Sequence, residues 1–286
     1  MMNLIRYYSN NEYSYKAVIN GEVYFSPVSS FNDPMDSQFV ILTGGEAIKI
    51  EEDYMSTIKR FIEQHPQKKF YKPTKNDPFE LGRALESIIK ECVGVACFTC
   101  ININNNESRP RISPAMFSHY GSHQTGFCCS FEYDDSLNEF EKVSYYDEFK
   151  HFSIEKTIGC IKGDKIDIKS LQKNPLTFKH IDWQSEQEFR AFNSVGKKLK
   201  FSDLGLKLKS VYLGPRFFYD FAQNNANHHK KEFIDYLLKL KLNNETKVIF
   251  LNTPISNNDN SLFRFNNLPS TWNEILEKLI NPHKLL

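Results

Sequence analysis

The sequence predicts an α+β protein, a single mixed domain of residues 1–286 with a central sheet flanked by helices. The 286 residues are 40% hydrophobic and 14% aromatic, which is enough to build a large core. Strand-like apolar runs crowd the middle of the chain, whereas helical signals precede and follow them. We find no internal repeat, Gly-rich phosphate loop or low-complexity linker that would mark a domain boundary.

The first elements are a short helix, a strand and a turn. Residues 10–20 favour a helix, with an Asn as a candidate N-cap and Gly21 as the stop. The strand EVYFS follows, and then the turn at residues 29–34. This turn is rich in residues that bond their own backbone or restrict φ, so we expect an ordered loop.

Two helices come next. Residues 45–65 have helical propensity, and Pro66 ends the segment. The second helix carries stronger signals, because Asp77 supplies an N-cap, Pro78 occupies the first helical position and Glu80 completes a capping box. These signals place its start at Pro78.

Strands dominate the middle of the chain, and helices return near its end. The predicted strands are residues 93–99, 126–133, 142–146, 157–162, 185–192, 210–214 and 247–252. The polar stretch 101–112 between the first two is expected to be a loop. The late helices are residues 228–241 and a segment from Pro269 onward, where Thr271 and Glu274 form a capping box.

The charge balance and the apolar runs limit the partners of the protein. Thirty-six Lys and Arg face 35 Asp and Glu, so no net field indicates a polyanion partner. No secretory-type start and no apolar run near the roughly 18 residues of a membrane span is visible. We therefore expect a cytoplasmic protein that does not bind membranes.

Six cysteines include a pair, Cys97 and Cys100, at a spacing seen in zinc and redox sites. The pair lies in the apolar run VGVACFTC, and a zinc site needs two more ligands at matched spacing. We therefore interpret the cysteines as reduced core thiols, and no metal site is predicted.

The segment Asp182–Ala191 is the most informative for chemistry. If it is a strand, its alternation places Glu186, Glu188 and Arg190 on one face. Two neighbouring carboxylates and a guanidinium suit the stabilisation of a cationic transition state. The alternative is a solvated or salt-bridged strand face.

Two other polar clusters are candidates. The segment 116–126 carries two His, two Ser, a Tyr and a Thr ahead of an apolar strand, either as cleft-lining or as structural residues. Arg6 and its neighbouring tyrosines, together with the turn Phe31-Asn-Asp-Pro34, suit the recognition of a phosphate or carboxamide. The alternative here is a surface Arg beside an ordinary turn.

In this order the segments resemble a widespread bacterial family, domain of unknown function 2971. The motifs are Leu4-Ile-Arg-Tyr7, Asn20-Gly21, Phe25-Ser-Pro27, Phe31-Asn-Asp-Pro34, Phe117-Ser-His-Tyr120, Gly126-Phe-Cys128 and Trp183-Gln-Ser-Glu-Gln-Glu-Phe-Arg190. The resemblance runs from about residue 4 to 214, and residues 215–286 form an extension. Phe117 stands where the family usually has Trp, so an aromatic side chain is kept.

The order of these motifs is similar to that of ADP-ribosyltransferases. That likeness implies a mainly antiparallel split sheet, NAD as the substrate that is consumed, and transfer to nucleic acid or protein, in a toxin or phage-defence effector with an antitoxin or regulatory partner. It implies that Glu188, Glu186 and His119 are catalytic. The cofactor-binding residues that it implies are Arg6, Tyr8, Tyr24, Ser26, Phe31, Asn32, Asp33, Ser118, Tyr120 and Arg190.

The implied chemistry is coherent, because loss of nicotinamide leaves positive charge on the ribose. A carboxylate on the 2′-hydroxyl, such as Glu188, orients the ring and stabilises the cation. Two alternatives remain. One is a metal-dependent nuclease or phosphodiesterase using Asp33, Asp36, Glu186, Glu188 and His119, and the other is a non-enzymatic nucleotide-binding module.

Overall fold

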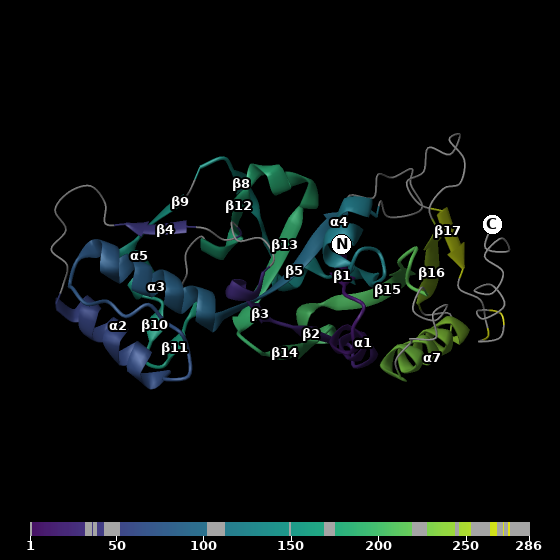
Figure 1. Ribbon diagram of the computed structural model, residues 1–286, viewed down its shortest axis with the longest axis horizontal. Coiled ribbons are helices and arrows are strands. Elements are labelled where there is room, and N and C mark those ends of the chain that lie inside the picture. Colours follow the sequence, from purple (N-terminus) through teal and green to yellow (C-terminus); the bar gives the residue numbers. More distant parts are fainter. Residues whose placement is uncertain are drawn as a thin grey trace. The chain divides into compact units, whose positions relative to one another are not determined.

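The computed structural model describes residues 2–31, 36, 39–42, 52–101, 112–148, 150–168, 175–218, 228–243, 246–252, 264–267, 271 and 274. Its helices and strands form a mixed α+β protein (Figure 1). The chain divides into two compact units that interleave in sequence. Unit 1 comprises Met1–Val23, Phe98–Asn138 and Leu199–Leu286, and unit 2 comprises Tyr24–Cys97 and Glu139–Lys198. The single domain that the sequence suggests stays a prediction.

The sheet of unit 1 is mainly antiparallel. Its strand order is β17 (Arg264–Asn267), β16 (Lys247–Asn252), β15 (Leu206–Leu213), β6 (Phe127–Tyr133), β1 (Met2–Tyr8) and β5 (Val93–Ile101). β5 enters the unit with its last four residues. β1 pairs with β6 over its whole length, and β15 pairs in parallel with β16.

Alternation along β1 divides the side chains of unit 1 between two faces. On one face Tyr8 stacks on Phe127, which also contacts Tyr15 of α1 (Glu12–Ile19) and Phe233 of α7 (His228–Leu242). These rings form an aromatic core beneath the two helices, which contact each other. Leu4 and Arg6 share this face with Tyr8 because they are four and two residues away in the strand.

The opposite face of the sheet carries a second cluster. Ile5 and Cys128 pack there with Phe117 of α4 (Pro114–Tyr120), and Tyr7 meets the Phe117 ring edge-on at 5.5 Å. Ile112, Tyr212, Ile249 and Leu251 complete the cluster. α4 therefore packs on the face away from Arg6 and Tyr8.

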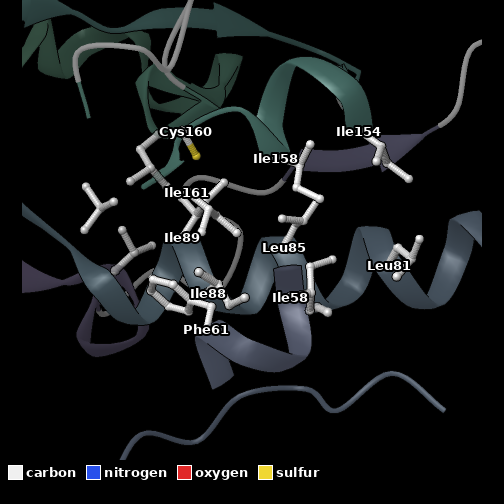
Figure 2. Close-up of a cluster of buried hydrophobic side chains, with 14 of the residues drawn as sticks. Ile58, Phe61, Leu81, Leu85, Ile88, Ile89, Ile154, Ile158, Cys160 and Ile161 are labelled. Carbon is white, nitrogen blue, oxygen red and sulfur yellow. The ribbon is translucent and has the colours of Figure 1, made fainter. Parts of the chain in front are cut away.

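Unit 2 has a helical core. α2 (Glu52–Gln64), α3 (Pro78–Cys92) and α5 (Ile154–Ile158) face one another through aliphatic side chains, as Figure 2 shows. Ile58 and Phe61 come from α2, and Leu85 comes from α3. The other labelled members are Leu81, Ile88, Ile89, Ile154, Ile158, Cys160 and Ile161. Their burial supplies the main hydrophobic stabilisation of this region.

The strands of unit 2 form one larger and several smaller ladders. β3 (Ser26–Pro27) and β13 (Glu188–Ser194) flank the first residues of β5, and β7 (Glu141–Lys142) pairs with β13. The remaining pairs are β4 (Phe39–Leu42) with β9 (Lys150–Ser153), β8 (Ser144–Tyr146) with β12 (Phe178–His180), and β10 (Ile161–Lys162) with β11 (Lys165–Ile166). The first two of these pairs are parallel.

Local capping signals locate the helix starts correctly. Asn11 accepts a hydrogen bond from the Ser14 N–H and caps α1, and Asp77 accepts from the N–H groups of Phe79 and Glu80 at the start of α3. Glu80, however, does not close the predicted capping box. Its carboxylate accepts from the Tyr71 hydroxyl at 2.6 Å and the Thr74 N–H at 2.9 Å, because the chain before α3 folds back over it.

Two element predictions are corrected. Residues 154–158 form α5 and only residues 161–162 of the predicted strand 157–162 are extended, because Ile154 and Ile158 are one helical turn apart and both enter the core. For the segment just before β6 the sequence predicts no element, and the structure has α4 there, with Ser113 as N-cap and Pro114 at its first position. The strand predicted at residue 185 begins at Glu188 and follows a 3-10 helix, η5 (Ile181–Glu186).

Some predictions lie outside the described residues, namely the turn residues Asn32, Asp33 and Pro34, the helix start at residues 45–51 and most of the loop 101–112. Of the last predicted helix, the Glu274 N–H donates to Thr271 Oγ1 at 3.3 Å, as a capping box requires. In the part of the chain that the structure describes, no helix is long and apolar enough to cross a membrane.

Candidate functional site: a buried charged centre

Unit 2 buries a group of charged side chains at the beginning of β13. Glu188 and Arg190 come from this strand, Glu186 from the end of η5, Lys179 from β12 and Asp36 from the segment after β3. Each of these residues has 5% or less of its surface exposed. We call this group the charged centre. Charges so far from water are tolerated only when they are paired.

Lys179 lies among three carboxylates. Its Nζ is 2.6 Å from Glu186 Oε2, 3.2 Å from Glu188 Oε2 and 3.2 Å from Asp36 Oδ2. The ring of Trp183 in η5 lies 5.1 Å from the same ammonium, within the range of a cation–π contact. Lys179 thus connects the two glutamates of the predicted site to each other.

Arg190 holds Glu188 and Asp36 from the other side. Its Nε donates to Glu188 Oε1 at 2.8 Å, while Nη2 donates to Glu188 Oε2 at 3.0 Å and to Asp36 Oδ2 at 2.7 Å. Nη1 donates to the Leu176 carbonyl at 2.7 Å. The two-pronged contact with Glu188 is the strong geometry for a guanidinium and a carboxylate. Phe31 lies 5.7 Å from the guanidinium.

These contacts perturb the ionisation of the centre. Burial alone would raise the pKa of Glu188, but the charges of Arg190 and Lys179 and hydrogen bonds from Arg190 and Cys97 outweigh it and lower the pKa from 4.5 to about 2. The pKa of Arg190 is raised well above its usual value, since the nearby Glu188 and Asp36 outweigh burial. The pKa of the Cys97 thiol is raised by burial and by Glu188. Cys97 is therefore an inert thiol at neutral pH.

Neighbouring strands and one turn position these side chains. β12 and β8 pair in parallel with Lys179 opposite Tyr145, and the Tyr145 hydroxyl accepts the Glu188 N–H at 2.8 Å. Gln187 takes a left-handed conformation with φ of 46°, which separates η5 from β13. Glu186 and Glu188 are therefore not alternate residues of one strand as the sequence predicts. They meet because both reach Lys179.

The charged side chains are buried and salt-bridged to one another, so the predicted solvation is wrong, while their part in catalysis stays a prediction. Strand alternation ignores the left-handed residue at Gln187 and the covering strands β8 and β12. Lys179 and Tyr145 were missed altogether. The available signal was indirect, because two adjacent buried carboxylates require cations, and no spacing rule says which Lys supplies one.

Two more predicted residues of unit 2 lie near β3. Tyr24 ends β2 (Glu22–Tyr24) and is 42% exposed, and Ser26 lies in β3 opposite Val95. The intervening Phe25 is held by backbone hydrogen bonds with Lys197 and Gly196. Asn32 and Asp33 lie outside the described residues. Of the predicted residues in unit 2, the structure brings Phe31, Glu186, Glu188 and Arg190 together.

In unit 1 the structure places Arg6 and Tyr8 side by side on β1. The Arg6 guanidinium lies 5.6 Å from the Tyr8 ring and 5.2 Å from the Phe98 ring. Tyr8 is 6% exposed, and its buried hydroxyl has no hydrogen-bond partner among the described residues. Burial raises the pKa of Tyr8, with Arg6 opposing the shift. An arginine over aromatic rings remains a suitable site for a planar or anionic group.

The remaining predicted residues, Ser118, His119 and Tyr120, belong to the last turn of α4. The His119 and Tyr120 rings are 6.3 Å apart, and His119 is exposed. Because α4 packs through Phe117 on the opposite face of the sheet, unit 1 does not bring His119 onto the face of Arg6 and Tyr8. The catalytic role of His119 stays a prediction.

A strained turn follows α4. Ser122, His123 and Gln124 have φ values of 48°, 52° and 70°, a conformation that costs non-glycine residues energy. Backbone hydrogen bonds from His123 to Ser118 and from Arg216 to Gln124 hold the turn, and the Asn10 N–H donates to Ser122 Oγ. Closely packed surroundings of this kind are needed to maintain local strain.

The predicted metal alternative has a partial counterpart. Asp36, Glu186 and Glu188 do meet, but the Lys179 ammonium occupies their meeting point. Among the residues that the structure describes, no group of three or more His, Cys, Asp or Glu side chains is arranged to hold a metal ion. All six cysteines are free thiols. His119 belongs to unit 1 and Asp33 lies outside the described residues.

Fold and site together define an α+β protein with a buried charged centre next to a mainly antiparallel strand ladder. Residues 116–191 match the family model described as protein of unknown function (DUF2971). The match supports the middle of the resemblance that the sequence suggests for residues 4–214, and it includes Lys179, Glu186, Glu188 and Arg190. Neither the curated proteins nor the solved structures contain a match to this chain.

Proposed function

We propose that the protein is an NAD-consuming, ADP-ribosyltransferase-like enzyme that modifies nucleic acid or protein, with the charged centre as its acidic part. The observation that carries the proposal is the pair of carboxylates, Glu186 and Glu188, bound to a single ammonium. Two closely spaced, ionised carboxylates can stabilise the positive charge that develops on ribose as nicotinamide leaves.

In this proposal Glu188 supplies constant negative charge. Its low pKa keeps it ionised throughout the physiological range, and Arg190 fixes its orientation. Glu186 is itself buried, but it ends η5, whose residues Asp182, Gln184 and Ser185 are exposed. Arg6 and Tyr8 remain the proposed contacts of the phosphate and of an aromatic ring of NAD.

One observation favours a second function, a non-enzymatic nucleotide-binding module. Both oxygens of Glu188 are already engaged by Arg190, and the whole centre is buried. Buried ion networks of this kind also serve to hold a fold together. Such a module would bind NAD without cleaving it.

The deciding experiment measures nicotinamide release from NAD by the purified full chain, alone and with DNA, RNA or cell lysate as acceptor. We expect release by the wild type and a loss of about a hundredfold or more in Glu188→Gln. The matched control is Glu132→Gln, which removes a carboxylate paired with Lys209 in unit 1. It should release nicotinamide at the wild-type rate.

Three other outcomes would oppose the proposal. Binding of NAD without release under all conditions would favour the binding module. Release that requires a divalent metal and stops with a chelator would favour metal-dependent chemistry. Equal release by Glu188→Gln and the wild type would remove the charged centre from the active site.

The proposed role as a toxin or defence effector with a neutralising partner predicts that the wild type, but not Glu188→Gln, slows the growth of an expressing bacterium.

A further inference from the structure

Lys179 is the residue of the charged centre that touches the largest number of its members. Its ammonium contacts the carboxylates of Asp36, Glu186 and Glu188, whereas the Arg190 guanidinium contacts those of Asp36 and Glu188. The shortest of the three Lys179 contacts, 2.6 Å, is the one to Glu186. Lys179 is thus the side chain that ties η5 to β13.

We propose that Lys179 is the positioning residue of the acidic centre, holding the Glu186 carboxylate beside that of Glu188 by binding both. For its effect on catalysis this inference rests on the proposed function. The positioning itself is a property of the folded chain and is testable without any substrate.

The physical reason is charge repulsion. Two carboxylates that converge in a buried place repel each other, and one of them takes up a proton or turns away unless a cation lies between them. Glu186 stands at the end of a short 3-10 helix, next to a left-handed residue, so backbone pairing alone does not hold it as β13 holds Glu188. The ammonium between the two carboxylates supplies that hold.

Among the described residues, the groups that contact Lys179 come from three segments of the chain. Glu186 and the Trp183 ring face it from η5, Glu188 from β13, and Asp36 from the segment after β3. Behind Glu188 lie Arg190, the Cys97 thiol of β5 and the Tyr145 hydroxyl of β8. The group whose ionisation responds to the loss of Lys179 is Glu188, because the charge of Lys179 is one of the causes that lower its pKa.

The first test is a double-mutant cycle on stability. Lys179→Met removes the charge and keeps most of the chain length, and it should lower the melting temperature at neutral pH by several degrees. Adding Glu186→Gln removes the carboxylate that loses its partner, so the double variant should melt at least ~3 °C higher than additivity of the two single changes predicts. Strict additivity would show that Lys179 does not hold Glu186.

The second test is pH dependence. Carboxylates with a depressed folded-state pKa contribute stability above their unfolded pKa, and that contribution disappears as the pH falls through the folded pKa. Without the charge of Lys179 the folded pKa of Glu188 rises, so the acid loss of stability should begin roughly one pH unit higher in Lys179→Met. Lys179→Arg keeps the charge and should stay near the wild-type curve. The control Lys209→Met, at a partly exposed pair with Glu132, should not move it.

The third test is nicotinamide release, if the wild type shows it. The acid limb of kcat should move upward in Lys179→Met, with KM changing less than kcat, and Lys179→Arg should restore part of the loss. A wild type without NAD activity would refute the proposed function and leave the stability tests to decide on Lys179. A Lys179→Met protein with the wild-type pH curve, or one that loses stability equally at all pH values, would overturn the positioning role. If Lys179→Met does not fold, Lys179→Arg is compared with the wild type. Positioning by charge requires both proteins to lose stability over the same acidic pH range, and a different range would overturn the proposal.

Discussion

The Lys179 ammonium and the Glu186 carboxylate lie 2.6 Å apart, and both side chains are nearly free of solvent. Lys179 lies in the strand β12, whereas Glu186 ends the 3-10 helix η5. No single strand or helix pattern therefore predicts that they meet. Because Lys179 also binds Glu188, it holds the carboxylates of Glu186 and Glu188 close together.

Glu188→Gln should destabilise the protein at neutral pH. A solvent-exposed strand-face carboxylate would tolerate this change, but Glu188 is buried between Arg190 and Lys179. The shift of its pKa from 4.5 to about 2 corresponds to about 3 kcal/mol. Because the pKa is lowered, this stability is complete above about pH 5 and is lost as the pH falls towards 2. Denaturant unfolding at pH 7, 4 and 2.5 should show the difference between variant and wild type shrinking. A difference in unfolding free energy that stays the same at all three pH values would contradict the ion pairs of Glu188 with Arg190 and Lys179.

Arg190→Lys should lower stability by about 3 kcal/mol although it keeps the charge. Arg190 is fully buried and donates to Glu188, Asp36 and the Leu176 carbonyl from three different nitrogens. A single ammonium cannot reach all of these acceptors. Thermal unfolding measures the loss, with Arg83→Lys on the exposed side of α3 as the control that should melt near the wild type. Equal melting temperatures of Arg190→Lys and Arg83→Lys would show that the separate hydrogen bonds of the Arg190 guanidinium do not stabilise the protein.

Tyr8→Phe should leave stability unchanged or raise it. Its buried hydroxyl has no hydrogen-bond partner among the described residues, so removing it relieves a desolvation cost. The same change at Tyr145, whose hydroxyl accepts the Glu188 N–H, should cost about 1 kcal/mol. Denaturant unfolding of both variants makes the comparison. A lower free energy of unfolding in Tyr8→Phe than in the wild type would contradict this prediction.

Gly126→Ala and Gly214→Ala should each destabilise unit 1 by about 3 kcal/mol or more. A Cβ at Gly126 would lie 2.2 Å from the Tyr8 carbonyl oxygen, and one at Gly214 would lie 2.2 Å from that of Gln124. Neither backbone atom can move without disturbing β1 or the left-handed turn at residues 122–124. The control is Gly163→Ala, where φ is +63° but no atom lies within 4 Å. It should cost only about 1 kcal/mol of backbone strain. Similar losses at all three positions would contradict the close packing.

Prediction from the sequence succeeded where the signal is local. The caps at Asn11 and Asp77 are bonds between residues two or three positions apart, so the pattern alone locates both helix starts. It failed where a neighbour in space overrides a local pattern. Glu80 has the capping-box position but binds Tyr71. The strand predicted at residues 157–162 begins with two residues that belong to α5, which packs against α3.

The sequence by itself determined the α+β class, the family likeness of the central segment and the choice of Glu186, Glu188 and Arg190 as candidate site residues, because composition, alternation and motifs are written along the chain. Only the tertiary structure decided what those residues do to one another. Asp36 and Arg190 are 154 positions apart and bond at 2.7 Å, and Lys179 reaches three carboxylates from a strand of three residues. Whether a carboxylate is solvated or buried, and which cation it meets, depends on the elements that fold over it, and no spacing within the sequence encodes that.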